Sequence, residues 1–336
     1  MNMTPNERAR QRLDFVRAQL GPDAPEPVSA SSDAGFRSYW RTQDAAGCSL
    51  IVMDCPPGLD DPRPWLRIRQ VLKAGGVRVP AVLSTDTEAG FLLMEDLGGP
   101  TLLQTITPAT ADTWFAHAIE QLVRIQRIPV PRDLPDYDAA LVQRELALFP
   151  DWFLGRHLGL ELSELEQAGL QKVCARLETA FLGQTQVLVH RDFMPRNLMP
   201  MADDLAVLDF QDAVRGPLAY DVISLFKDAF LSWPQTRIDT WVAEYRRAAL
   251  DAGLPVPDAD TFRRDLDYTG IQRHLKVLGI FARLQHRDHK PRYLADAARF
   301  LAYLDTTLPA YPELAALHGL LQRRVFPLIA PLDLPS

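Results

Sequence analysis

The sequence predicts an α+β protein of two lobes, a small β-rich lobe followed by a large, mainly helical one. Three observations support this fold class. Short apolar runs bounded by turn residues dominate residues 1–97. Apolar residues at helical spacing dominate residues 98–336. The connector Gly98-Gly99-Pro100 separates the two patterns, so we place the boundary between the lobes at residues 97 and 98.

Each element of the first lobe follows from its residue pattern. Residues 6–20 carry apolar side chains at helical spacing, and the Pro- and Ser-rich residues 21–34 are predicted to form a loop. Pro64 and Gly75-Gly76 are typical of the start and the end of a helix. The predicted strands are 36–42, 48–55, 79–84 and 91–95. The lobe is therefore a small sheet with one internal helix.

The second lobe is predicted to be helical except near its middle. The helical segments are 109–128, 138–149, 163–182, 217–231, 236–251, 259–285 and 292–306. A β-branched run at Gln186–Val189 predicts a strand. Two further apolar runs, 198–200 and 205–208, flank the turn residues Ala202-Asp203-Asp204 and predict a hairpin. These strands bracket the most informative motif of the chain, within residues 188–212.

That motif is His190-Arg191-Asp192 with Asn197 five residues later. This is the H-R-D-x-x-x-x-N spacing of a kinase catalytic loop, in which the aspartate accepts the proton of the substrate hydroxyl and the asparagine holds magnesium. His190 is predicted to support the loop. The hairpin returns the chain, so Asp209 is expected near Asn197, and their oxygens suit Mg²⁺. The motif predicts phosphoryl transfer from ATP within a bilobal protein-kinase-like fold.

The chain contains a second His-Arg-Asp tripeptide that lacks this context. His286-Arg287-Asp288 lies in a helical pattern, and the residue five positions after Asp288 is Tyr293 rather than Asn. We predict a solvated, charged turn there.

Composition excludes several other classes of function. The 336 residues carry a net charge of −7 without a dense basic patch, so no nucleic-acid partner is expected. No apolar run is long enough to span a membrane, and Met1–Arg12 has no apolar signal core. Three cysteines without a C-x-x-C pair favour the reducing cytosol, so a cytoplasmic location is expected. The oligomeric state is not predicted.

The spacing after the motif argues against a protein substrate. Protein kinases order a peptide with an activation segment after their D-F-G signature. Here Asp209-Phe210-Gln211 is followed almost at once by Arg215-Gly216-Pro217 and a predicted helix. The long, mainly helical stretch between Glu95 and His190 can instead surround a small acceptor.

Four stretches carry a resemblance to the aminoglycoside phosphotransferase/choline kinase superfamily, and more narrowly to the bacterial anomeric kinases of N-acetylmuramate and N-acetylglucosamine. They are Ser32–Arg41, Ile51–Pro57, Asp209–Ala213 with Gly216–Asp221, and Gln272–Gly279. The resemblance implies ATP- and Mg²⁺-dependent phosphorylation of the C1 hydroxyl of these amino sugars during peptidoglycan recycling. It also implies that Asp192 orients that hydroxyl and that Asp221 braces the catalytic loop; the alternative for Asp221 is an ordinary aspartate in the first turn of a helix.

The first lobe lacks the usual phosphate-binding pair of kinases. The strand Ser49–Asp54 has no Lys, and the helix Pro64–Ala74 has no Glu. Arg37 and Arg41 share one face of a strand, so one of them is expected to reach the phosphates; the alternative is a solvated strand face. The segment Phe91–Leu97 resembles the hinge that holds adenine, with backbone groups near Glu95 and Leu97 as partners. The choice between ATP and GTP stays open.

The sequence defines the acceptor-binding site less closely than it defines the catalytic loop. Arg273 or His274, on the helix 259–285, is a candidate to meet a substrate carboxylate such as the lactyl group of N-acetylmuramate; the alternative is a solvated helix face. Other small acceptors stay open, namely an aminoglycoside, choline or homoserine. An aminoglycoside site needs carboxylates, which the second lobe contains at Asp136, Asp138, Glu145, Asp151 and Glu161. A nucleotide-binding pseudokinase scaffold is a further alternative, against which the retained Asp192, Asn197 and Asp209 argue.

Overall fold

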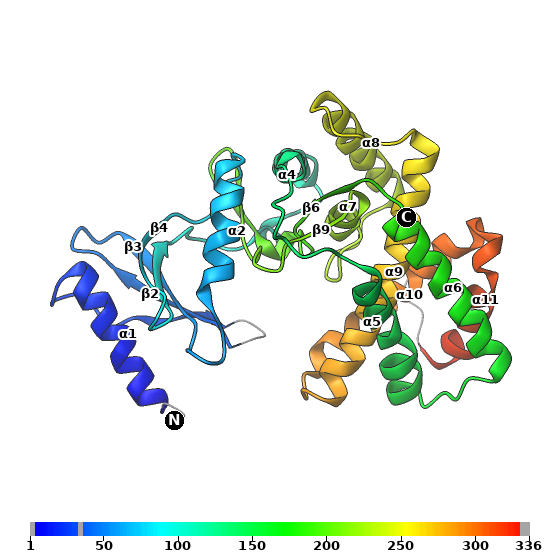
Figure 1. Ribbon diagram of the computed structural model, residues 1–336, viewed down its shortest axis with the longest axis horizontal. Helices are drawn as coiled ribbons and strands as arrows, with labels where there is room; N and C mark the ends of the chain where they lie inside the picture. Colours follow the sequence, from blue (N-terminus) through cyan, green and yellow to red (C-terminus); the bar gives the residue numbers. More distant parts are fainter. Residues whose placement is uncertain (1–3, 33–35, 330–336) are drawn as a thin grey trace. The chain divides into compact units, whose positions relative to one another are not determined.

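The structure is a computed structural model that describes residues 4–32 and 36–329. Residues 33–35 of the stretch Ser32–Arg41 lie outside the described residues. The chain forms two compact units. Figure 1 labels helices and strands of both units. The first unit comprises Met1–Thr105 with Arg196–Gln211, and the second comprises Ile106–Pro195 with Asp212–Ser336. The second half of the catalytic loop and the hairpin therefore belong to the first unit.

The first unit is built on a five-stranded antiparallel sheet of order β1-β2-β3-β5-β4. The strands are β1 (Val28–Ser32), β2 (Ser38–Gln43), β3 (Ser49–Asp54), β4 (Val82–Asp86) and β5 (Phe91–Glu95). The sequence predicted a loop where β1 lies. That strand reads Val-Ser-Ala-Ser-Ser, with Val28 and Ala30 as its apolar residues. So short and weakly apolar a pattern did not predict a strand, and β1 pairs with β2 at the edge of the sheet.

Helix α1 (Pro5–Leu20) covers part of this sheet. Thr4 and Glu7 form a capping box at its start. Phe15 and Val16 pack in one buried cluster with core residues of β3 and β5. Asp54 of β3 is buried and accepts hydrogen bonds from the α1 residues Arg8 (2.8 Å) and Arg12 (2.9 Å). An apolar contact and a charged contact therefore both attach α1 to the sheet.

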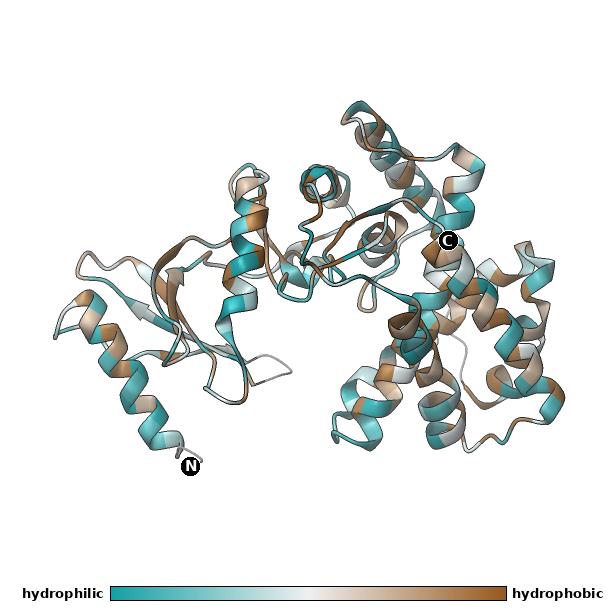
Figure 2. Cartoon of the chain, in the orientation of Figure 1, coloured by the Kyte–Doolittle hydropathy of each residue, from teal (hydrophilic) through white to brown (hydrophobic). Residues whose placement is uncertain are grey.

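Helix α2 (Pro62–Ala74) begins after the Asp61 cap, two residues before the predicted start. Trp65, Ile68 and Leu72 are buried and share one helical face. Figure 2 shows hydrophobic and hydrophilic residues alternating along this helix. A single-turn helix, α3 (Leu102–Thr105), ends the first stretch of this unit.

The predicted hairpin is present in the first unit. It follows the 3₁₀ turn Pro195–Asn197 and consists of β7 (Leu198–Pro200) and β8 (Leu205–Val207). The Leu208 N–H donates to the Asn197 carbonyl oxygen at 2.9 Å, which closes the hairpin. The Val207 N–H donates to the Arg78 carbonyl oxygen at 2.8 Å and ties the hairpin to the rest of this unit.

The second unit is mainly helical, as predicted. Its helices are α4 (Ala111–Arg127), α5 (Ala139–Leu148), α6 (Glu164–Leu182), α7 (Ala219–Phe226), α8 (Gln235–Asp251), α9 (Ala259–His286), α10 (Ala297–Thr307) and α11 (Ala315–Leu320), with a π-helical segment at Phe149–His157. Strand β6 (Gln186–Val189) pairs with β9 (Val214–Pro217). The helix predicted over 217–231 is shorter at both ends, since Pro217 belongs to β9 and α7 ends at Phe226. No helix of the described residues is long and apolar enough to cross a membrane.

Helix α9 lies at the centre of the second unit. It packs against α5, α6, α7 and α10. Residues Asp267–Leu275 are all buried, so this part of the helix has no solvated face. Its polar side chains, including Gln272, Arg273 and His274, are therefore interior groups, and the solvated-face alternative for Arg273 and His274 is wrong.

Candidate active site

The catalytic loop leaves the buried end of β6 and is held by Asp221. Asp221 lies in the first turn of α7 and is fully buried. Its carboxylate accepts the backbone N–H of His190 at 2.7 Å and that of Arg191 at 3.0 Å. Arg191 adopts a left-handed backbone conformation, with φ of 76°. This is the geometry expected of a brace, because the two bonds fix the backbone immediately before Asp192.

His190 and Asp221 differ in how they support the loop. His190 is 1% exposed, and its Nδ1 accepts the Asp192 N–H at 3.3 Å. Burial raises the pKa of Asp221 to about 7, although the two backbone N–H donors act in the opposite direction. Asp221 is thus a carboxyl group whose charge state changes near neutral pH.

A buried cluster around Glu145 holds the side chain of Arg191. Glu145 accepts from Arg191 at 3.1 Å and from Gln272 at 3.3 Å, and it pairs with Lys276 at 2.9 Å. The Tyr137 hydroxyl also donates to Glu145. Burial alone raises the pKa of Glu145, but Lys276 and the other donors outweigh it, so the pKa lies below its usual value. Glu145, on α5, is therefore a buried anion that holds the Arg191 side chain of the catalytic loop.

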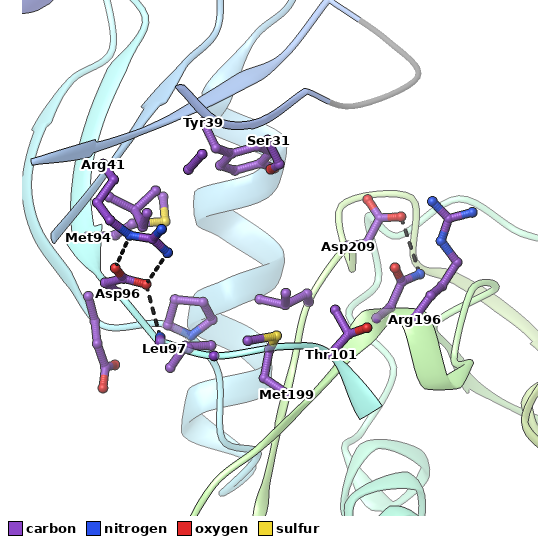
Figure 3. Close-up of a pocket in the computed structure, with 18 of the residues that line it drawn as sticks. Ser31, Tyr39, Arg41, Met94, Asp96, Leu97, Thr101, Arg196, Met199 and Asp209 are labelled. Atoms are coloured by element: carbon purple, nitrogen blue, oxygen red, sulfur yellow. Dashed lines mark hydrogen bonds and ion pairs between the residues drawn. The ribbon is translucent and has the colours of Figure 1, made fainter. Parts of the chain in front are cut away.

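A pocket of about 480 Å³ lies within the first unit. Its walls come from the sheet, the connector after β5 and the hairpin (Figure 3). Ile51, Met94, Met199 and Leu208 supply apolar surface. Asn197 and Asp209 line the same pocket. A pocket that combines an apolar wall with metal-type ligands suits a nucleotide, whose base is flat and whose phosphates carry the metal.

Asn197 and Asp209 fit a magnesium ion. The Asn197 amide donates to the Asp209 carboxylate at 3.4 Å, and the Gln211 amide donates to its other oxygen at 2.9 Å. The described residues hold no cluster of three or more His, Cys, Asp or Glu side chains suited to a metal. Mg²⁺ does not require one, because it is commonly bound by one or two carboxylates together with substrate phosphates.

The connector after β5 offers backbone groups to a base. The Glu95 side chain pairs with Arg78 and accepts the Ala81 N–H at 3.0 Å, and Arg78 lowers the pKa of Glu95. The Glu95 N–H is used by the Ala81 carbonyl at 2.8 Å. Leu97 has no backbone hydrogen bond to any of the residues that the structure describes. Both Glu95 and Leu97 line the pocket, so the Leu97 backbone can pair with a base there.

The two arginine candidates lie in different places. Arg41 lines the pocket and forms two hydrogen bonds with Asp96, at 2.6 and 3.3 Å. Its side chain is 45% exposed. Arg37 is buried, pairs with Asp60 at 3.1 Å and is absent from the lining of this pocket.

The two acceptor candidates on α9 are interior. Arg273 is 3% exposed, and its charge opposes the rise in the pKa of Asp221. His274 is 2% exposed and stacks on Tyr303 at 5.2 Å between ring centroids. Burial lowers the pKa of His274 well below its usual value, so the ring is neutral at physiological pH. Their role toward a substrate stays a prediction.

Sequence reasoning missed three groups of this site. Glu145 was named only as one of several second-lobe carboxylates that an aminoglycoside could meet, and its pairing with Arg191 and Lys276 was not predicted, since these partners lie far along the chain. Gln211, which binds Asp209, stands where a kinase signature has Gly. Arg196, which lines the pocket, directly precedes Asn197 in the motif and was available as a signal from that position.

The catalytic loop has the residue spacing of a kinase. Asn197 and Asp209 offer oxygen ligands of the kind that Mg²⁺ prefers, and the pocket they line suits a nucleotide. These features are those of a phosphotransferase. The model of the phosphotransferase enzyme family matches residues 26–266, and the chain belongs to this family. Among solved structures, a choline kinase from Streptococcus pneumoniae shares the fold with a TM-score of 0.62 at 14% identity, over 90% of this chain and 99% of that one. The architecture is therefore protein-kinase-like.

Two curated relatives are much more similar in sequence. An N-acetylmuramate/N-acetylglucosamine kinase of Pseudomonas putida is 49% identical over 88% of this chain and 87% of its own length. Its namesake of Pseudomonas aeruginosa is 49% identical over 91% of each chain. The chain is an ATP-dependent kinase that acts on a hydroxyl group, and the scaffold alternative is set aside.

Proposed function

We propose that the protein uses ATP and Mg²⁺ to phosphorylate the anomeric C1 hydroxyl of N-acetylmuramate, N-acetylglucosamine or both, as a step of bacterial cell-wall recycling. The observation that carries this proposal is the 49% identity, over about nine tenths of both chains, to relatives that are named for these two sugars. The free thiols of Cys48, Cys55 and Cys174 suit the reducing cytosol, where we place the activity.

Asp192 is the group that we assign to the acceptor. Its backbone is fixed by His190 and by the brace at Asp221. A carboxylate in that position accepts a hydrogen bond from the acceptor hydroxyl and orients its oxygen toward the γ-phosphate. A hemiacetal hydroxyl is more acidic than an ordinary alcohol, so it loses its proton more readily and needs less assistance from Asp192 as a general base. Most of the catalysis then comes from positioning and from neutralising charge.

The nucleotide is assigned to the pocket of the first unit. The apolar wall and the Leu97 backbone hold the base, and Arg41 is the sequence-predicted arginine that lines this pocket. Asn197 and Asp209 would hold Mg²⁺, which would supply positive charge to offset that of the ATP phosphates.

The test compares acceptors under identical conditions. The protein is incubated with Mg-ATP and, separately, with N-acetylmuramate, N-acetylglucosamine, kanamycin, choline and homoserine, and ADP release is followed. We expect turnover with one or both amino sugars. The methyl glycoside of N-acetylglucosamine, in which C1 is blocked but C6 is free, should give none. Turnover of the methyl glycoside would contradict the C1 assignment, and turnover of kanamycin, choline or homoserine alone would overturn the choice of sugar.

Asp192→Asn tests the catalytic assignment. Loss of the carboxylate should lower kcat by about 10²- to 10⁴-fold, because a positioned general base contributes on that scale. Asp288→Asn is the matched control, since Asp288 belongs to the second His-Arg-Asp tripeptide and pairs with its neighbour Arg287. Equal activity of the Asp192→Asn variant and the control would refute the role of Asp192.

A further inference from the structure

We propose that Arg196 binds the phosphates of ATP and replaces the strand lysine that kinases commonly use. Strand β3 reads Ser-Leu-Ile-Val-Met-Asp and offers no cation. The inference rests only on the use of ATP, not on the identity of the sugar.

The position of Arg196 supports this role. It lies in the 3₁₀ turn Pro195–Asn197, directly before the magnesium-type ligand Asn197. It is exposed and lines the pocket together with Asn197 and Asp209. Figure 3 shows Arg196 and Asp209 at one end of the pocket and Arg41 with Asp96 at the other. Mg²⁺ is commonly bound together with substrate phosphates. The phosphates are therefore expected near Asn197 and Asp209, which would hold the ion, at the Arg196 end of the pocket.

The two cations of the pocket lie at its opposite ends. Among the described lining residues, the cations are Arg41 and Arg196, and the anions are Glu95, Asp96 and Asp209. Arg41 is engaged in a two-bond pair with Asp96, which also accepts from Ser49 and from the Gly98 N–H. That pair is electrically neutral and belongs to the Arg41 end of the pocket.

The chemistry of arginine fits the ligand. ATP carries about four negative charges at neutral pH, of which one Mg²⁺ offsets two, so a further cation is needed near the metal. A guanidinium group is planar, stays charged at physiological pH and can bind two phosphate oxygens at once. The turn that carries Arg196 is fixed by the Leu208–Asn197 backbone bond, so its side chain starts from a defined backbone.

The experiment separates phosphate binding from base binding. ATP and adenosine are titrated by calorimetry, with Mg²⁺ and again in EDTA, into wild type and the variants Arg196→Ala, Arg196→Lys, Arg41→Ala and Arg17→Ala. Arg17 is an exposed arginine of α1 in the same unit and serves as the control. For Arg196→Ala we expect the Kd of ATP to rise about ten- to a hundredfold in both conditions, while the Kd of adenosine stays unchanged. Arg196→Lys should recover part of the loss.

Three results would overturn the proposal. One is an ATP Kd of Arg196→Ala within twofold of wild type. Another is an equal loss for ATP and adenosine, which would indicate a disturbed pocket. The third is a loss of ATP affinity in Arg41→Ala with none in Arg196→Ala, which would assign the phosphates to Arg41. All of these binding measurements are made without a sugar. Their outcome is therefore independent of whether the proposed acceptor is correct.

Discussion

Glu145 gives the catalytic loop a permanent anionic partner. In many protein kinases an arginine pairs with a phosphorylated residue of the activation segment, and that pair orders the segment. This chain has no room for such a segment after Asp209. Instead, Glu145 of α5 pairs with Arg191 at 3.1 Å in the interior of the second unit. The geometry of the loop is therefore expected to be independent of phosphorylation.

Glu145→Gln tests this positioning role. We expect kcat to fall while the KM for ATP stays unchanged, because the pocket that we assign to the nucleotide is built from residues of the first unit. The protein should also lose about 3–5 kcal/mol of stability, since Lys276 and Arg191 keep their charges without the buried carboxylate. Steady-state kinetics and urea unfolding measure the two effects. Glu164→Gln, at an exposed position of α6, is the control. An unchanged kcat in folded Glu145→Gln would rule out the positioning role.

The pKa of Asp221 predicts how kcat depends on pH. Its pKa is raised by burial to about 7. As the pH falls through this value the carboxylate gains a proton and holds the His190 and Arg191 N–H groups less strongly. The value of kcat should therefore fall on the acid side of pH 7. The Asp221→Asn variant should be less active at all pH values, and its pH–rate profile should lack the fall in kcat near pH 7. If the variant still loses activity as the pH falls through 7, another group is responsible for that titration.

The raised pKa of Asp221 also predicts that the stability of the folded protein depends on pH. This dependence is opposite to that of kcat, because stability should fall as the pH rises. The folded pKa of Asp221, about 7, lies above the ordinary value of about 3.9. Its contribution to stability is therefore fully present below about pH 3.9 and is lost as the pH rises through 7. Urea unfolding at pH 5 and pH 8 should show a smaller pH dependence in Asp221→Asn than in wild type.

At the scale of the elements, the local patterns predicted the long helices and the inner strands. The edge strand β1 and the strand β9 were missed. Both are short and lack a clear apolar alternation, and each exists because a partner strand pairs with it. Helix α9 was predicted with nearly its observed bounds, yet its burial from Asp267 to Leu275 was not. Helical spacing reveals where a helix runs, whereas burial depends on how many neighbours surround it.

Gly279 shows how that packing constrains α9. A Cβ at this position would lie within 2.5 Å of the carbonyl oxygen and the Cβ of Leu148, at the end of α5. In an exposed helix, Gly→Ala stabilises by about 1 kcal/mol. Here overpacking against backbone should reverse the sign, and Gly279→Ala should destabilise by about 1–3 kcal/mol.

Urea unfolding checks this sign directly. Gly319→Ala in α11 is the matched control, because its Cβ would meet only the flexible end of the Arg323 side chain. A Gly279→Ala variant as stable as wild type would mean that α5 and α9 can separate at little cost.

At the scale of the whole molecule, the chain enters the first unit twice. The segment Arg196–Gln211 leaves the second unit and completes the pocket of the first with Asn197, Asp209 and the hairpin. The boundary placed at residues 97 and 98 from sequence lies inside the first unit, which continues to Thr105. A change of composition along the chain cannot reveal such a return, because the returning segment is short.

Ligand binding should be visible in the unfolding of the whole protein. Mg-ATP at a hundred times its Kd should stabilise the folded state by about 2.7 kcal/mol. EDTA should reduce that gain, because the Mg²⁺ that Asn197 and Asp209 would hold adds positive charge beside the phosphates. Thermal unfolding with ATP, with and without EDTA, measures the difference. Asp209→Asn should show little further loss on addition of EDTA; equal effects of EDTA on both proteins would exclude Asp209 as a magnesium ligand.

The sequence alone determined the class of the enzyme and the catalytic loop. His190, Asp192, Asn197 and Asp209 lie within twenty residues, so their spacing and the hairpin between them follow from local chain geometry. The partners of these groups come from much further away. Arg191 meets Glu145 across 46 residues, and Arg41 meets Asp96 across 55. Such pairs depend on which helices and strands pack together, and only the tertiary structure determines that packing.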